Sequence, residues 1–280
     1  MMCGMKRNCK KISIIIPLYN YYDGILKIVE SFQGDDLREI EVIVFDDSDD
    51  PVEQLRIQEL VAKYDNFITY RHNNVSYGPV FNWNALLDIA SADYIVLMHH
   101  DEFILSKKFI TNAICKIEKL HFDVGIFDCF LMKNGKIFRR HLPILFRFFL
   151  WKFFPLYIFR RNFIGPTASL IVRRELCEHF DNNLKWLVDV DWYYRLMLRT
   201  HKLACLNDIA ICSQIDSKQS ITGKIKDELP IILNDEEIYL SRKYKKKLLL
   251  LFTNKGFLSK IFCFFESLMW KVLSVFMLSF

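Results

Sequence analysis

Apolar segments and helical patterns alternate over the first part of this chain, and the alternation limits the folds that it can adopt. Four segments rich in β-branched and aromatic residues are predicted strands, namely 11–20, 39–47, 67–72 and 93–98. Apolar residues recur at helical spacing in the segments that follow them, 23–33, 52–64, 79–91 and 106–120. Nearly continuous apolar strands separated by helices indicate a parallel sheet covered on both faces. Because crossover connections are right-handed, we predict a doubly wound, mostly parallel α/β domain.

The same patterns predict where strands stop and which helix faces are buried. We expect the first strand to stop at Pro17. The expected apolar residues of helix 52–64 are Val52, Leu55, Leu60 and Val61, and those of helix 79–91 are Phe81, Trp83, Leu86 and Leu87. Farther along, two strands are expected within 124–140, a strand and then a helix in 165–175, a helix in 184–200 and strands in 203–214.

Length, charge and cysteine usage exclude several classes of protein. A chain of 280 residues with 52% hydrophobic residues can bury a large core in one domain with a tail. A net charge of +5 suits an anionic substrate or membrane surface without requiring either, and we predict no nucleic-acid partner. The eight cysteines form no C-x-x-C pair, so we expect reduced thiols in a cytosolic protein. The N-terminus lacks the apolar region of a signal peptide.

Polar residues gather where each of the four predicted strands ends. The ends read PLYN (17–20), DDSDD (46–50), HNN (72–74) and HHDE (99–102). One such end would be ordinary turn chemistry, since Asp and Asn favour loops. In doubly wound sheets, however, ligands bind beyond the carboxyl ends of the strands. Four polar ends at one sheet edge therefore predict a ligand site.

The order of these motifs resembles a known enzyme family. SIIIPLYN, EVIVFDDSDD, GPVFNWNALLDIASADYIVLMHHDE and VDVDWYYRL follow one another as in the family 2 glycosyltransferases, over roughly residues 11–222. The strings NWN and IGPTASLIVRRE resemble bacterial enzymes that build surface polysaccharides. The resemblance implies a GT-A fold and an inverting transfer from a nucleotide-diphosphate sugar, with UDP favoured. It also implies an N-terminal extension (1–10), a glycosyltransferase domain (11–225) that divides after residue 130 into nucleotide-sugar and acceptor halves, and a helical tail (226–280).

The resemblance assigns the donor to the predicted sheet edge. Asp47 would read the nucleotide base, and Asp46 would support the ribose or the loop. A helix N-cap before 52–64 is the structural alternative for this segment, with Ser48 or Asp49 as the cap. The helix start after Gly78 suits phosphate or ribose oxygens. The other implied donor contacts are Pro17, Tyr19, Asn74, Asn82, Asn84, His99, His100 and, by a loose alignment, Lys218.

The segment HHDE departs from the family's Asp-x-Asp motif. Asp101 keeps the second Asp, which implies a direct ligand of Mn²⁺ or Mg²⁺, and Asp216 is a loosely aligned second ligand. His99 stands at the first position, where it is expected to hydrogen-bond a ribose or a phosphate. A zinc site on His99 and His100 is not expected, because adjacent strand residues point to opposite faces. A solvated strand end is the plain alternative.

VDVDWYYRL carries two candidates for the catalytic base. The acceptor hydroxyl must lose a proton as it attacks, so a carboxylate is needed. Asp189 aligns with the family's base, while Val188 replaces the family's preceding Glu. Asp191 is the base instead if the helix begins later, since positions two apart on a helix do not share a face. A carboxylate stabilised by the helix dipole is the structural alternative.

Two segments combine apolar and basic residues. Segment 141–161 is dense in aromatic residues, and 256–280 has a broad apolar helical face. Each either packs on the domain or lies on an anionic membrane surface, and for 256–280 we favour the membrane. The implied acceptor is a lipid-linked intermediate of O-antigen or capsule synthesis at the inner face of a bacterial membrane.

Two other function classes fit parts of the sequence. A nucleotidyltransferase would show a Gly-rich, basic loop after the first strand, which PLYNYYDG lacks. A non-catalytic scaffold with a degenerate metal site would explain His99 and Val188. The joint presence of Asp47, Asp101 and Asp189 argues against the scaffold.

Overall fold

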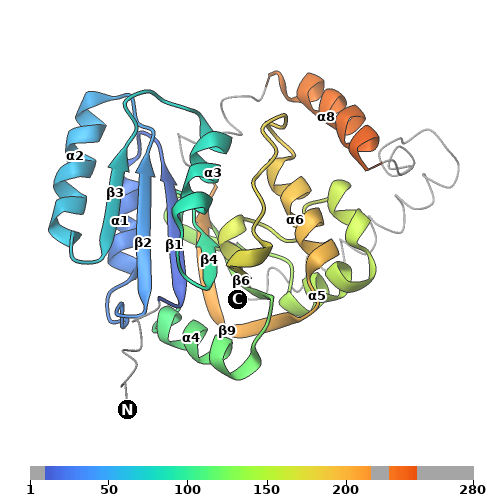
Figure 1. Cartoon of the computed structure of the whole chain (residues 1–280), viewed down its shortest axis with the longest axis horizontal. Helices are drawn as coiled ribbons and strands as arrows, with labels where there is room; N and C mark the ends of the chain where they lie inside the picture. Colours follow the sequence, from blue (N-terminus) through green and yellow to red (C-terminus); the bar gives the residue numbers. More distant parts are fainter. Residues whose placement is uncertain (1–9, 216–226, 245–280) are drawn as a thin grey trace, which may run out of the picture.

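The computed structural model describes residues 10–215 and 227–244, and their strands form one sheet between helices (Figure 1). The strands are β1 Ile12–Leu18, β2 Ile40–Asp46, β3 Ile68–His72, β4 Tyr94–Leu97, β5 Glu102–Ile104, β6 Val124–Lys133, β7 Lys136–Arg140, β8 Leu170–Arg173 and β9 Leu203–Gln214. The helices are α1 Tyr22–Ser31, α2 Pro51–Val61, α3 Pro79–Ile89, α4 Phe109–Leu120, α5 Ile144–Phe153, α6 Val188–Arg199 and α8 Leu229–Lys243. Short 3-10 turns cover Ala62–Tyr64, Pro155–Phe159, Thr167–Ser169 and Arg174–Leu176.

The sheet has the strand order β3-β2-β1-β4-β8-β6-β9-β5, with β7 paired to β6. β1 is parallel to β2 and β4, and β2 is parallel to β3. β8 runs antiparallel to both β4 and β6, so β6 and its parallel partner β9 point the same way as β4. β1, β2, β3, β4, β6 and β9 thus share one direction, while β5, β7 and β8 oppose it. The prediction of a mostly parallel, doubly wound sheet is confirmed.

Side chains alternate across the sheet and divide the core into two layers. Ile14 and Ile16 of β1 pack with the buried faces of α1, α2 and α4. Ile15 packs on the opposite face, in the cluster that holds α3, α5 and α6. This division follows from the two-residue period of a strand. Each isoleucine buried in this way contributes about 1.5–3 kcal/mol to stability.

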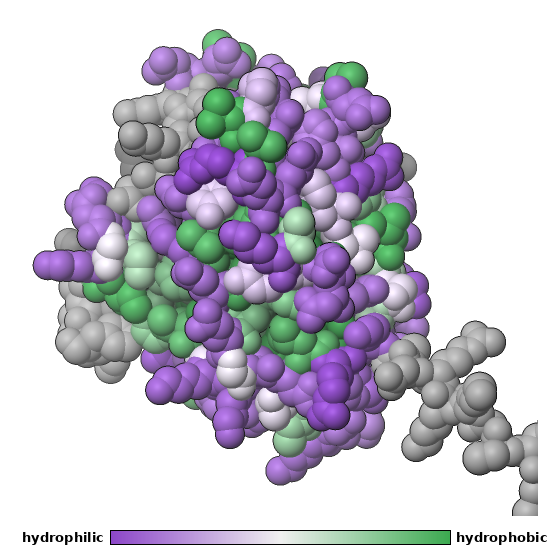
Figure 2. Space-filling model, turned by 90° about the vertical axis from the view of Figure 1, so that its left-hand side faces the viewer, coloured by the Kyte–Doolittle hydropathy of each residue, from purple (hydrophilic) through white to green (hydrophobic). Residues whose placement is uncertain are grey.

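Two local expectations were wrong. β1 continues through Pro17 to Leu18, because its pairing with β4 ends at Ile15 and leaves one side of the strand without a ladder. In α2 the buried face is Ile57, Leu60 and Val61, whereas Val52 and Leu55 are 67% and 59% exposed. The α2 side of the molecule is mostly hydrophilic, with hydrophobic residues in scattered patches (Figure 2).

The structure also differs from the prediction at a helix cap, at one helix face and in two segments after residue 165. Asp50, rather than Ser48 or Asp49, caps α2: its Oδ1 accepts the N–H of Val52 at 2.9 Å and that of Glu53. Phe81 of α3 is 57% exposed and does not share the buried face of that helix. The expected helix at the end of 165–175 is a single 3-10 turn, and 203–214 forms one long strand.

The aromatic segment 141–161 is half packed and half exposed. Leu150 and Trp151 of α5 are buried. The fully buried Arg147 donates to the carbonyls of Ile164 at 2.9 Å and Phe127 at 2.6 Å. The opposite side exposes Leu145, Phe149, Phe153 and Phe154. Among the helices described, none has the length and apolar character needed to cross a membrane.

Candidate active site

Asp47, at the carboxyl end of β2, organises the loop that precedes α3. Its buried carboxylate accepts the backbone N–H groups of Tyr77 at 2.9 Å and Gly78 at 2.8 Å. The Ser76 hydroxyl donates to it at 2.9 Å and the Asn73 amide at 3.1 Å. Four donors on one carboxylate fix this loop above the sheet edge.

The predicted donor residues on β1 and β2 form a second network at the same edge. Asp46 is fully buried; it accepts the Tyr70 hydroxyl of β3 at 2.8 Å and the backbone N–H of Ser48, in the loop after β2, at 3.0 Å. The Tyr19 hydroxyl donates to Asp49 at 3.0 Å. Asn20, in a left-handed conformation with φ 45°, accepts the N–H groups of Asp49 and Asp50 at 3.1 Å each. Asn20 is the last residue of PLYN, and no role was predicted for it from the sequence. Pro17 lies in the buried strand.

The three predicted asparagines have different surroundings. Asn82 is buried and donates to the carbonyl of Phe45 at 3.1 Å, which holds α3 to β2. Asn84 exchanges two hydrogen bonds with the backbone of Phe180, at 3.0 and 2.7 Å, so its amide secures the loop before α6 and does not line the sheet edge. Asn74 is exposed, and its neighbour Asn73 is the residue that contacts Asp47. Gly78, with φ 83°, precedes α3 as predicted.

The two histidines of HHDE pack against different helices. The His100 ring lies edge-on to Tyr21 with ring centroids 5.5 Å apart. A Cβ on Gly24 of α1 would fall 2.0 Å from the His100 carbonyl oxygen, so only glycine permits this approach. The His99 ring instead packs on Trp83 of α3, with centroids 4.9 Å apart.

Glu102, the first residue of β5, orients His99. Its carboxylate accepts the backbone N–H of His99 at 2.8 Å and lies 3.5 Å from Nδ1 of the imidazole ring. Burial opposes a charge on His99, but Glu102, Asp101 and Asp189 outweigh it and raise the pKa of the imidazole. Nδ1 also lies 3.4 Å from the Thr167 hydroxyl, whereas Nε2 is buried and has no hydrogen-bond partner among the described residues.

Asp189 lies in the first turn of α6 and is electrostatically coupled to the HHDE turn. One carboxylate oxygen accepts the Val190 N–H at 2.8 Å, and the other accepts the Asn162 amide at 2.9 Å. Burial raises the pKa of Asp189 to about 6, and Glu102 adds to the rise, against the opposing effects of the Val190 N–H and His99. Burial and Glu102 also raise the pKa of Asp101 to about 6. The charges of His99 and Glu102 thus act on Asp189, which links the start of α6 electrostatically to the HHDE turn.

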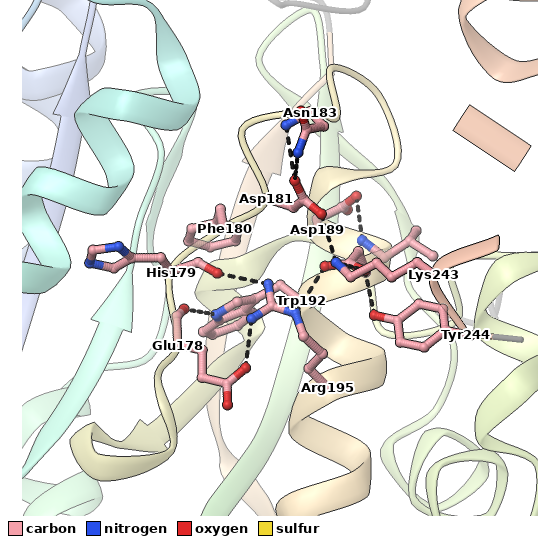
Figure 3. A network of polar contacts seen from close by, with 12 residues as sticks. Glu178, His179, Phe180, Asp181, Asn183, Asp189, Trp192, Arg195, Lys243 and Tyr244 are labelled. Atoms are coloured by element: carbon pink, nitrogen blue, oxygen red, sulfur yellow. Dashed lines mark hydrogen bonds and ion pairs between the residues drawn. The ribbon is translucent and has the colours of Figure 1, made fainter. Parts of the chain in front are cut away.

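The Asp191 carboxylate forms ion pairs on another side of α6. It is fully buried and accepts Arg195 Nε at 2.9 Å and Lys243 Nζ at 2.9 Å, so its side chain joins α6 to α8. Figure 3 shows this side of α6, where Arg195, Lys243 and Tyr244 all donate hydrogen bonds to the Asp191 carboxylate. The helix begins at Val188, later than the predicted start at 184, but the Asp191 carboxylate is bound by Arg195 and Lys243, so we keep Asp189 as the candidate base. The predicted residues Asp216 and Lys218 lie outside the described residues.

Glu102, Asn162 and Thr167 are site residues that carried no role in the sequence interpretation. Asn162 belongs to a loop with no periodic pattern, and its contact with Asp189 spans 27 residues. Glu102 is the last residue of HHDE, and a carboxylate directly after Asp101 was the only sequence feature that could have indicated its role.

Comparison with known proteins decides the family. The sequence model described as glycosyl transferase family 2 matches residues 13–180. The chain belongs to glycosyltransferase family 2. Its motif order, strand ends and fold agree with that membership, as the sequence predicted.

Bacterial relatives share parts of the chain. A Campylobacter jejuni GalNAc(5)-diNAcBac-PP-undecaprenol beta-1,3-glucosyltransferase is 30% identical over 127 residues, which cover 45% of this chain and 40% of that protein. The putative colanic acid biosynthesis glycosyl transferase WcaA of Escherichia coli is 30% identical over 206 residues, 69% of this chain and 68% of WcaA. The chain thus spans less than half of the Campylobacter relative and about two thirds of WcaA.

Solved structures show the same fold at low identity. Staphylococcus aureus TarS 1-349 in complex with UDP-GlcNAc has a TM-score of 0.59 at 22% identity, covering 76% of this chain and 60% of that one. The mannosyltransferase PcManGT of Pyrobaculum calidifontis, in complex with GDP-Man and Mn2+, has a TM-score of 0.57 at 12% identity, covering 82% and 65%. These similarities confirm the predicted GT-A type fold.

The described residues do not form a complete metal site by themselves. Within 10–215 and 227–244, no group of three or more His, Cys, Asp or Glu side chains could hold a metal ion. Asp101 is nevertheless an oxygen donor, and burial and the Glu102 carboxylate raise its pKa to about 6. Mg²⁺ is often bound by one or two carboxylates together with substrate phosphates. The residues present fit a cation shared with an anionic ligand.

Proposed function

We propose that this chain is an inverting glycosyltransferase that moves a sugar from a nucleotide-diphosphate sugar, with UDP as the favoured nucleotide, to a hydroxyl of a glycan acceptor. The observation that carries the proposal is the placement of the Asp47 loop and the HHDE turn directly after the parallel strands β2 and β4, in a chain that the family 2 model matches. A pKa of about 6 leaves Asp189 ionised at neutral pH yet basic enough to accept a proton.

Each step is assigned to a group of the chain. The acceptor oxygen attacks the anomeric carbon while its proton passes to Asp189. The bond from that carbon to the diphosphate oxygen breaks, and the nucleoside diphosphate leaves with the electron pair. Attack opposite the leaving group inverts the anomeric centre. The loop on Asp47 is the proposed base-binding surface, and His99, whose Nε2 has no hydrogen-bond partner among the described residues, is the proposed contact to a ribose or phosphate oxygen.

A divalent cation fits this arrangement. Asp101 would hold Mn²⁺ or Mg²⁺, and the donor diphosphate would supply other oxygens. When bound, the ion would neutralise charge that develops on the leaving group. The Mn²⁺ bound with GDP-Man in the archaeal structure supports a search for metal dependence in this chain.

The acceptor and the location are finer proposals. The Campylobacter relative's name specifies an undecaprenol-linked acceptor, which supports a lipid-linked acceptor here. An enzyme acting on such a substrate would work at the inner face of the cell membrane. The exposed aromatic face of α5 supports peripheral contact there, and the other predicted contact, 256–280, lies outside the described residues.

A donor screen tests the proposal. The full chain is incubated with individual nucleotide sugars and lipid-linked glycans, with Mn²⁺ or with a chelator, and released nucleotide is measured. We expect one donor to yield nucleotide and glycosylated acceptor with the metal. Asp189→Asn should abolish transfer while donor binding stays nearly unchanged, because the base does not hold the donor. Full activity in Asp189→Asn would overturn the assignment of the base.

A further inference from the structure

Asn162 has an amide group whose orientation is fixed by its own loop. Its Oδ1 accepts the backbone N–H groups of Ile164 at 3.1 Å and Gly165 at 3.0 Å. An amide oxygen that accepts two N–H groups cannot be exchanged with the nitrogen without losing both bonds. The Nδ2 group is therefore directed to the other side, where it donates to the Asp189 carboxylate at 2.9 Å.

The loop that carries Asn162 is itself held by buried groups. The Ile164 carbonyl accepts Arg147, which is fully buried, and the Gly165 carbonyl accepts the Tyr193 hydroxyl at 2.9 Å. Gly165 has φ 93°, and a Cβ there would lie 3.2 Å from the His141 ring. A side chain at Gly165 would be strained by the positive φ of the backbone and by its close approach to the His141 ring. Asn162 thus presents its N–H₂ from a rigid support.

Both oxygens of the Asp189 carboxylate accept a hydrogen bond. One oxygen accepts the Val190 N–H and the other accepts Asn162, so the carboxylate is held at both ends. The titratable groups that face it are His99, Glu102 and Tyr193. Hydrogen bonds to a charged carboxylate favour that form. Within this set, Asn162 is a neutral donor whose orientation does not depend on pH.

We propose that Asn162 is a positioning residue for Asp189: it acts through the carboxylate and not on the substrate. The inference rests on the proposed function, in which Asp189 is the base. It assigns a role to the segment between β7 and β8, which the sequence marked only as an aromatic-basic stretch followed by a strand.

The test is the variant Asn162→Asp. The new carboxylate keeps an oxygen for the N–H groups of Ile164 and Gly165, so these two loop contacts remain, but it places an oxygen against Asp189, and against the Gly165 carbonyl, where a donor was. We expect kcat at neutral pH to fall by about tenfold or more and the acid limb of the pH profile to move to higher pH. The donor KM should change by less than about twofold, because no donor contact is removed.

A matched variant gives the control. Asn183 also donates its amide to an aspartate, Asp181, at 2.9 Å, in the loop that leads to α6. Asn183→Asp makes the same chemical change beside a carboxylate that is not the base, so its pH profile should equal that of the wild type. Thermal unfolding of both variants identifies any general loss of structure. A wild-type pH profile in Asn162→Asp would overturn the inference.

The outcome separates the two proposals. If Asp189→Asn is inactive and Asn162→Asp is normal, Asp189 is the base but Asn162 does not position it. If Asp189→Asn retains transfer, the proposed function fails at its base, whatever Asn162→Asp does. Asn162→Ala, which removes the loop bonds as well, should lower both kcat and thermal stability, and an unchanged kcat in this variant would also contradict the inference.

Discussion

The ionisation of one carboxyl group links activity to pH. Asp189 must be deprotonated to accept a proton, and burial raises its pKa to about 6. The raised pKa means that protonation sets in at a higher pH than for an ordinary aspartate. We therefore expect kcat/KM to rise with pH through about 6 and then to level off. Initial rates measured at saturating metal over this range check the prediction, and a flat profile down to about pH 5 would contradict it.

Residue-level interactions were the least predictable part of the site. The sequence indicated Asp47, Asp101 and Asp189 because their types and order match a chemical need. It did not indicate which neighbours hold them. Asn162 and Asp189 are 27 residues apart, and their contact depends on how a loop without periodicity folds over α6. The roles of Asn84 and Asp191 were missed for the same reason, since both are bonded across long separations.

At the scale of elements, α8 supplies the capping group for the start of α6. The Leu187 position before α6 has no capping side chain. Glu236 of α8 is buried and accepts the backbone N–H groups of Lys185 at 2.5 Å, Trp186 at 3.1 Å and Leu187 at 2.7 Å. A carboxylate at a helix N-terminus satisfies free N–H groups and interacts well with the helix dipole. α8 therefore helps to stabilise the turn that carries Asp189.

Removing that charge should weaken the molecule. In Glu236→Gln one of the two oxygens becomes an N–H₂ group that faces backbone donors, and we expect a loss of about 1–2 kcal/mol, the usual effect of losing a cap. The melting temperature should fall by about 2–4 °C for each kcal/mol. Glu237→Gln is the control: it makes the same chemical change at the next residue of α8, whose carboxylate caps no helix in the described part of the chain. Equal melting temperatures for Glu236→Gln and Glu237→Gln would show that the cap contributes nothing.

Elements were predicted well where local pattern and burial agree. The order of strands and helices from residue 11 to 120 follows from alternating apolar runs, since both sheet faces are covered, except for the short strand β5, Glu102–Ile104, which was not predicted. Errors arose where a tertiary neighbour changes a local rule. Pro17 continues a strand because β4 no longer pairs beside it, and Val52 and Leu55 are exposed because α2 buries Ile57, Leu60 and Val61 instead.

At the scale of the whole molecule, exposed hydrophobic residues are distributed over separate faces. α5 exposes Leu145, Phe149 and Phe153, with fractions of 71%, 45% and 62%, and Lys152 is exposed beside them. α2 exposes Val52 and Leu55 but lies toward the other end of the molecule (Figure 1). Aromatic residues interleaved with basic ones suit an anionic membrane surface, where the rings enter the interface and the cations meet the headgroups.

Sedimentation with lipid vesicles distinguishes the two faces. The triple variant Leu145→Ser, Phe149→Ser and Phe153→Ser should lower binding of the full chain to anionic vesicles by about a hundredfold or more, since each buried aliphatic or aromatic group contributes roughly 1 kcal/mol or more at an interface. The control Val52→Ser with Leu55→Ser removes exposed hydrophobic residues of α2 and should leave binding unchanged. Binding should also weaken as salt rises, because cations contribute to it. If both variants bind as tightly as the wild type, α5 does not contact the membrane and its aromatic residues serve another surface.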